Sequence, residues 1–118
     1  MVNTKQMIEE VRKIASENPD FTYGGPRCSY FGSTLGVLEG QCCIIGQAFK
    51  NLGVDTAKLL SQEEDDFSPS VEHTITAGIV DVDILSDKDL DWLSSVQTCQ
   101  DAKWSWEDAV RYADGGAV

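Results

Sequence analysis

Apolar residues near the start of the chain recur at the spacing of one face of an α-helix. That face consists of Met7, Ile8, Val11, Ile14 and Ala15. Offsets of four, seven and eight residues return to the same side of a helix, so the segment is expected to bury that side in a core. Asn3 and Gln6 have the spacing of a capping box at its start. Asn18-Pro19 ends it, because the residue before a proline disfavours the α conformation.

Three later segments repeat this helical spacing. A helix is expected over about residues 41–52, where QCCIIGQAF supplies apolar side chains and Gly53 follows. Another begins at Ser86, where Asp89 completes the spacing of a second capping box. The last begins at Ser105 and ends before Gly115-Gly116. A short helix capped by Asp55 is predicted as well.

Two segments favour β structure. Cys28–Phe31 and Leu35–Leu38 flank Gly32-Ser33-Thr34, which predicts a small hairpin. Residues 71–85 are rich in β-branched side chains and favour a half-buried strand, with a helix over 70–78 as the alternative. The expected fold is therefore α+β and predominantly α. It is a single domain, residues 1–118, of four to five helices with a small β-hairpin.

The net charge of −11 lies entirely in the second half of the chain. Residues 1–61 carry six basic and six acidic side chains, whereas residues 62–118 carry three basic and fourteen acidic ones. Such a field repels nucleic acid and membrane surfaces and attracts basic partners. The alternative is that the charge serves solubility alone.

The four cysteines form no recognisable metal motif. Their positions, 28, 42, 43 and 99, contain no CxxC pair, and His73 is the sole histidine. Buried small apolar side chains are the usual role of free cysteines, so QCCIIGQAF is interpreted as the start of a core helix. The polar N-terminus lacks a secretion signal, no apolar run is long enough to span a membrane, and the thiols are free, which together predict a cytoplasmic protein.

The acidic segments do not match a cation site. A calcium loop beginning at Asp87 would need glycine at its sixth and glutamate at its twelfth position, where this chain has Trp92 and Thr98. Asp81 and Asp83 have the spacing of a magnesium pair, but two solvated carboxylates are the simpler interpretation. No metal and no cofactor are therefore expected.

Three tryptophans accompany the acidic half of the chain, and tryptophan is enriched where binding energy concentrates. The simpler alternative is that they pack the last two helices together. The predicted partner-binding surface comprises Glu63, Glu64, Asp65, Asp66, Asp81, Asp83, Asp87, Asp89, Asp91, Trp92 and Trp104.

Parts of the chain resemble small uncharacterised proteins of actinobacterial phages and their hosts. The resemblance covers about residues 11–53 and 90–114 and is carried by NPDFTY, CSY, CCIIGQAF and WLSSVQTCQDAKWSWEDAV. It implies a compact cytosolic protein of viral origin and identifies no catalytic residue. The acidic stretch 62–91 departs from that pattern, so a partner bound there would be particular to this chain.

Three functions are compatible with these observations. The leading one is a non-enzymatic phage accessory factor that binds and inhibits a basic host protein. Nucleic-acid-binding proteins are one class of such partners. The second is a protein that sequesters a nucleotide signal through Tyr23, Arg27, Tyr30 and Gln41 near a helix N-terminus. The third is a small enzyme that uses Cys43 or His73.

Overall fold

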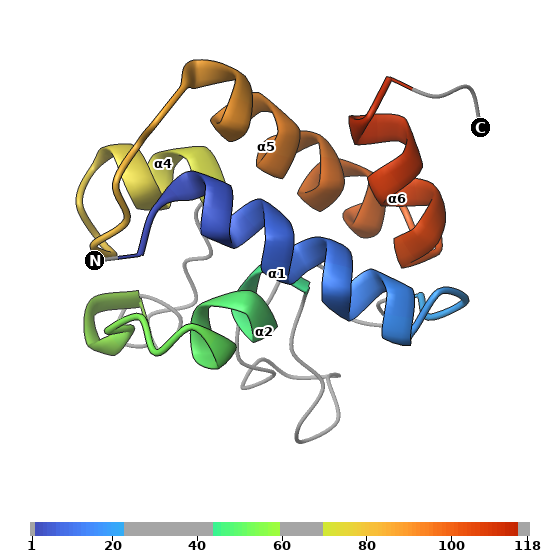
Figure 1. The fold of residues 1–118 in the computed structure, drawn as a ribbon, viewed down its shortest axis with the longest axis horizontal. Coiled ribbons are helices and arrows are strands. Elements are labelled where there is room, and N and C mark those ends of the chain that lie inside the picture. The colour runs from blue at the N-terminus through green and yellow to red at the C-terminus, as the bar shows by residue number, and fades with distance from the viewer. Residues whose placement is uncertain (1, 23–43, 60–69, 116–118) are drawn as a thin grey trace.

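The computed structural model describes residues 2–22, 44–59 and 70–115, and the structural statements below refer to these ranges. The helices there are α1 (Thr4–Glu17), α2 (Ile44–Asn51), α4 (Val71–Thr76), α5 (Asp87–Asp101) and α6 (Trp106–Ala113). A helical turn at residues 57–59 follows α2. Helix α5 contacts each of the other four, so it is the central element of the fold (Figure 1).

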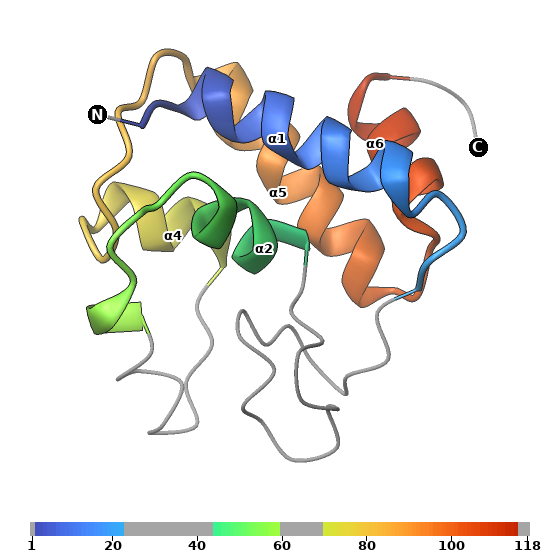
Figure 2. The same ribbon diagram turned by 60° about the horizontal axis from the view of Figure 1, so that its bottom comes forward.

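The expected α+β class is wrong, because the described part of the chain is helical and contains no strand. Its single β-type pairing is an isolated parallel bridge between Asn3 and Asp83. The hairpin predicted at Cys28–Phe31 and Leu35–Leu38 lies outside the described residues. The helices form a compact bundle-like arrangement in which α1 crosses over α2 and α5 (Figure 2).

Helix α1 confirms its sequence prediction. The Asn3 side chain accepts a hydrogen bond from the Gln6 backbone N–H at 2.9 Å, and the Gln6 side chain accepts one from the Asn3 N–H at 3.0 Å. These two bonds complete the predicted capping box. Asn18 ends the helix, as expected from the proline that follows it.

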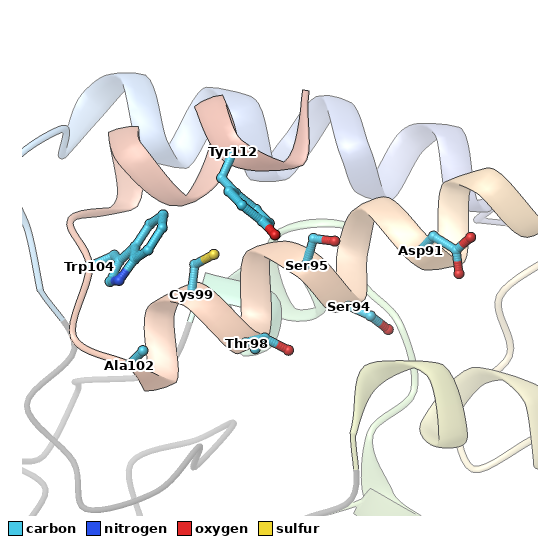
Figure 3. Close-up of a pocket in the computed structure, with 8 residues that line it drawn as sticks. All are labelled: Asp91, Ser94, Ser95, Thr98, Cys99, Ala102, Trp104 and Tyr112. Atoms are coloured by element: carbon cyan, nitrogen blue, oxygen red, sulfur yellow. The ribbon is translucent and has the colours of Figure 1, made fainter. Parts of the chain in front are cut away.

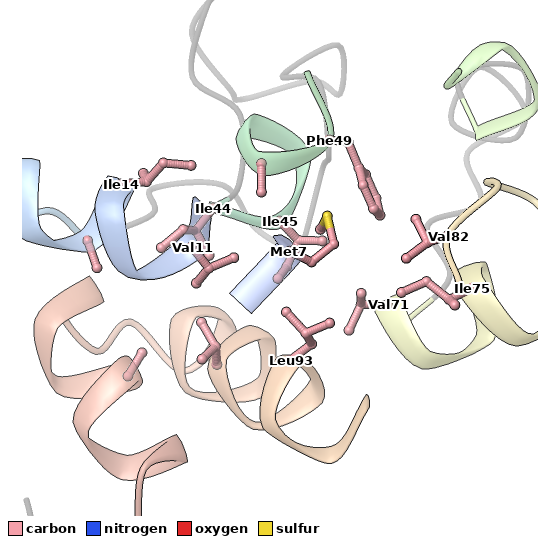
Figure 4. Packing of buried hydrophobic residues seen from close by; sticks show 14 of the residues in the cluster. Met7, Val11, Ile14, Ile44, Ile45, Phe49, Val71, Ile75, Val82 and Leu93 are labelled. Carbon is pink, nitrogen blue, oxygen red and sulfur yellow. The ribbon is translucent and has the colours of Figure 1, made fainter. Parts of the chain in front are cut away.

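The hydrophobic core lies where α1, α2 and α5 meet. Met7 and Val11 on α1, Phe49 on α2 and Leu93 on α5 are all fully buried. Figure 4 shows these side chains pointing toward one another from their helices. Ile44 and Ile45 are also fully buried, so this part of QCCIIGQAF is a core helix as predicted. Cys42 and Cys43 lie outside the described residues.

Residues 71–85 divide into a helix and an extended segment, so of the two alternatives the helix is confirmed for residues 71–76. Ser70 caps α4 by accepting a hydrogen bond from the His73 N–H at 3.2 Å. The hydroxyl of Thr74 donates back to the Ser70 carbonyl at 2.8 Å. These local bonds allow β-branched residues to form a short helix. Beyond it, Val80 and Val82 are buried and alternate with exposed Asp81 and Asp83.

Two buried glutamines on α5 connect it to the beginnings of two other helices. The side-chain oxygen of Gln100 accepts a hydrogen bond from the backbone N–H of Ile44 at 2.7 Å, and that of Gln97 accepts one from the N–H of Val71 at 2.8 Å. The first N–H groups of a helix have no acceptor within the helix. Helix α5 therefore supplies acceptors to both α2 and α4.

The corner between α5 and α6 is a Schellman motif. The N–H of Trp104 donates to the Cys99 carbonyl and the N–H of Lys103 to the Gln100 carbonyl, at 3.1 and 2.9 Å. Lys103 takes the left-handed conformation, with a φ of 71°. Ser105 then caps α6 by accepting from the Asp108 N–H at 3.2 Å, as its sequence predicted.

Candidate partner-binding site

An open groove of about 500 Å³ lies between α5 and α6. We call it the α5–α6 groove. Its residues are Asp91, Ser94, Ser95, Thr98, Cys99 and Ala102 from α5 and the following turn, Trp104 from the corner, and Tyr112 from α6. Figure 3 shows Trp104 and Tyr112 on either side of Cys99, with Asp91 farther along α5. The groove therefore has an aromatic end and an acidic end.

The aromatic end is formed by two rings that contact each other edge to face. The centroids of Trp104 and Tyr112 are 5.5 Å apart, and the planes make an angle of 86°. Tyr112 is 50% exposed. The Schellman motif holds the backbone of Trp104 against Cys99. Part of a rigid aromatic surface is thus open to solvent.

Cys99 forms the floor beneath these rings and is 6% exposed. Burial raises the pKa of its thiol above the usual value, because the apolar surroundings disfavour the charged thiolate. A protonated thiol is a weak nucleophile. The cysteine in the groove therefore contributes apolar surface.

The acidic end is formed by Asp91, the charged residue of the groove lining. Asp87 lies one helical turn before it on the same face of α5, since residues four apart lie one above the other. Both side chains are exposed. None of the described residues that line the groove is basic, and Lys88 lies one turn before Asp91 on the same helix.

The predicted acidic residues have different environments. Asp81, Asp83, Asp87 and Asp91 are exposed and available to a partner. Asp89 is half-buried, and its carboxylate accepts a hydrogen bond from the Thr4 hydroxyl at 2.9 Å.

The prediction of a capping box between Ser86 and Asp89 is therefore wrong in part. Ser86 is the N-cap, but its hydroxyl accepts from the Lys88 N–H. The acidic run Glu63, Glu64, Asp65 and Asp66 lies outside the described residues.

Trp92 is separated from Trp104 and contributes to a contact among three elements. Its indole N–H donates to the Asp114 carboxylate at 2.9 Å, and the Arg12 guanidinium lies 4.9 Å from its ring centroid. Arg12 also donates two hydrogen bonds to Asp114, at 2.8 and 2.5 Å. These bonds, first that of Arg12 and then that of Trp92, hold the pKa of Asp114 below its usual range. Trp92 thus has a structural role beside its predicted binding role.

Of the residues named for the two alternative functions, the structure describes only His73. Tyr23, Arg27, Tyr30, Gln41 and Cys43 lie outside the described residues. His73 is exposed on α4, on a different helix from the groove lining. Among residues 2–22, 44–59 and 70–115, no group of three or more potential metal ligands occurs. No helix in the same ranges has both the length and the apolar character needed to cross a membrane.

Sequence reasoning missed most of the groove. Ser95, Thr98 and Ala102 follow one exposed side of α5, and their helical spacing was readable from the sequence. Tyr112 is not among the partner-binding residues expected from the sequence. The groove exists because α6 packs beside α5 after the turn at Lys103, and no local sequence pattern specifies that placement.

Comparisons of the chain with protein-family models, with curated proteins and with solved structures found no match. The resemblance to phage proteins therefore stays a prediction.

Proposed function

We propose that this chain is a non-enzymatic protein that binds a basic partner protein through its acidic 81–91 surface. We define that surface as Asp81, Asp83, Asp87 and Asp91. The observation that carries the proposal is that four exposed carboxylates lie within eleven residues, where Lys88 is the single basic side chain. A rigid helix and the extended segment before it present them. Negatively charged carboxylates held in place on the surface favour fast association with a positively charged partner.

The proposed effect on the partner is inhibition by occupation of its basic surface. Where that surface binds nucleic acid, the carboxylates of the 81–91 surface would take the place of phosphates. The resemblance to phage proteins would make the partner a host protein. Binding of this kind weakens as salt rises, because counterions screen exposed charges.

The experiment is capture of partner proteins on the immobilised chain at low salt and at about 1 M salt, where the screening length is about 3 Å. The test variant carries Asp81→Asn, Asp83→Asn, Asp87→Asn and Asp91→Asn together. The matched control removes four other exposed charges by Glu9→Gln, Glu17→Gln, Asp20→Asn and Glu72→Gln. Both variants have the same net charge, so they differ only in where the charge is lost.

We expect the wild type and the control variant to retain a basic protein at low salt. The test variant should not retain that protein. Purified partner should then bind the wild type with an affinity that falls steeply with salt. Equal retention by the two variants would show that total charge, and not the 81–91 surface, governs binding. Absence of any salt-sensitive basic protein would overturn the proposal.

A further inference from the structure

We propose that the α5–α6 groove receives an amphipathic basic helix of the partner. An apolar side chain of that helix would pack against the exposed part of the Trp104–Tyr112 pair beside Cys99, and a lysine or arginine would pair with Asp91. This inference rests on the proposed function and adds to it the part of the partner that is recognised.

The floor of the groove permits the close approach of a helix. Ser95, Thr98 and Ala102 have small side chains and lie along one side of α5, over a rise of about 10 Å, or two helical turns. The distance between two packed helices depends on the side chains at their contact, and small ones allow the shorter distances. Two turns of a partner helix can therefore lie along this floor.

The aromatic end provides a place for an apolar anchor. Trp104 and Tyr112 stand on either side of the Cys99 floor, and their mutual contact restricts their movement before a partner arrives (Figure 3). Preorganised side chains lose little conformational entropy on binding. Tryptophan and tyrosine are also the residues that most often carry interface binding energy. An apolar side chain covering Tyr112 would bury surface that is now half exposed.

Charge decides between the possible occupants of the groove. Asp91 lines it, Asp87 lies one turn beyond, and the described lining contains no cation. A second copy of this chain would bring its own net charge of −11 and meet electrostatic repulsion. A nucleic acid would meet the same repulsion. A basic helix complements the carboxylates and can still supply an apolar residue one or two turns away.

A second groove, of about 420 Å³, is less suited to the same occupant. Its lining includes Arg12, Glu107 and Val110 on α1 and α6. Arg12 brings a positive charge to that lining and is already paired with Asp114. Glu107 carries the opposite charge in the same lining, so a basic helix would gain no net attraction there. The contrast assigns the basic helix to the α5–α6 groove.

The experiment uses two synthetic peptides as probes with the full chain. One has about 15 residues, with leucine and arginine on one helical face, and the other has the same composition in scrambled order. Titration calorimetry gives the Kd of each peptide. The groove is filled by Thr98→Trp at an exposed position, and its charge is removed by Asp91→Asn. Glu9→Gln, an equal loss of charge at an exposed α1 position, is the matched control.

We expect the ordered peptide to bind at least about tenfold more tightly than the scrambled one. Thr98→Trp should weaken its binding about tenfold or more, Asp91→Asn by about three- to tenfold, and Glu9→Gln by less than about twofold.

Equal affinities for the two peptides, or a Kd unchanged by Thr98→Trp, would overturn the inference. The proposed function would survive these results if the capture experiment still depended on the 81–91 surface. Loss of that dependence, with intact peptide binding in the groove, would overturn the proposed function and leave the groove as a separate binding site.

Discussion

The side-chain oxygen of Gln100 on α5 accepts a hydrogen bond from the backbone N–H of Ile44, the first residue of α2, at 2.7 Å. The same oxygen accepts from the indole N–H of Trp106 on α6 at 3.2 Å. Gln100, Ile44 and Trp106 are all buried, so water cannot replace Gln100 as the acceptor of either hydrogen bond. One amide thus connects three helices, and its removal leaves two buried donors without their acceptor.

Gln100→Leu should lower the free energy of unfolding by about 2–4 kcal/mol, because each unsatisfied buried donor costs about 1–3 kcal/mol and the leucine recovers some apolar burial. Urea titration followed by circular dichroism measures this change. Thr98→Ala, at an exposed position on the same helix, should change it by less than about 0.5 kcal/mol. A Gln100→Leu variant as stable as the wild type would contradict this role.

Gln97→Leu should destabilise α4 more than the rest of the molecule. The Val71 N–H would lose its acceptor, and a helix of six residues has little stability of its own. Hydrogen exchange should show the Val71 amide exchanging at least about tenfold faster, with Ile44 much less affected. Gln100→Leu should give the opposite pattern, so each variant is the control for the other. A uniform acceleration in both would argue against separate attachment of α2 and α4.

Asp114→Asn should make stability less dependent on acid pH. Because the folded pKa of Asp114 lies below its unfolded value, its ion pair contributes stability above about pH 4 and loses it as pH falls through the folded pKa. Both partners are partly exposed, so the contribution is at most about 1 kcal/mol. Urea titrations at about pH 7, 5 and 3 should show the variant's deficit shrinking only at the lowest pH. A loss of stability that is equal at all three pH values would rule out Asp114 as the titrating group. Glu9→Gln, which also removes one exposed carboxylate, is the control variant.

Lys103→Gly should raise the free energy of unfolding by about 1 kcal/mol. Lys103 has a φ of 71°, in the left-handed region that costs most side chains about 1–2 kcal/mol. Glycine adopts this conformation without that cost, although it also loses more backbone entropy on folding. Lys103→Ala keeps the left-handed cost and should remain near wild type. Thermal unfolding gives the melting temperatures of the two variants. Equal melting temperatures would show that the left-handed backbone at Lys103 does not destabilise the protein.

The sequence by itself determined the local features of the fold. The capping box of Asn3 and Gln6, the apolar face of α1 and the N-cap Ser105 depend on residues three or four positions apart. Interactions at this range are present whatever the rest of the chain does, so their patterns are readable in advance. The concentration of carboxylates at 81–91 is likewise a property of the sequence. For residues 71–76 the sequence left strand and helix open, and the N-cap Ser70 accompanies the helix that formed.

Only the tertiary structure decided which polar groups are used inside the protein and which remain for a partner. Gln100 and Ile44 are 56 residues apart, Thr4 and Asp89 are 85 apart, and Trp92 and Asp114 are 22 apart. Such pairs form only after the helices have packed, because each contact needs two elements whose relative placement is set by the whole core. The same packing brings Tyr112 beside Trp104 and opens the α5–α6 groove next to Asp91.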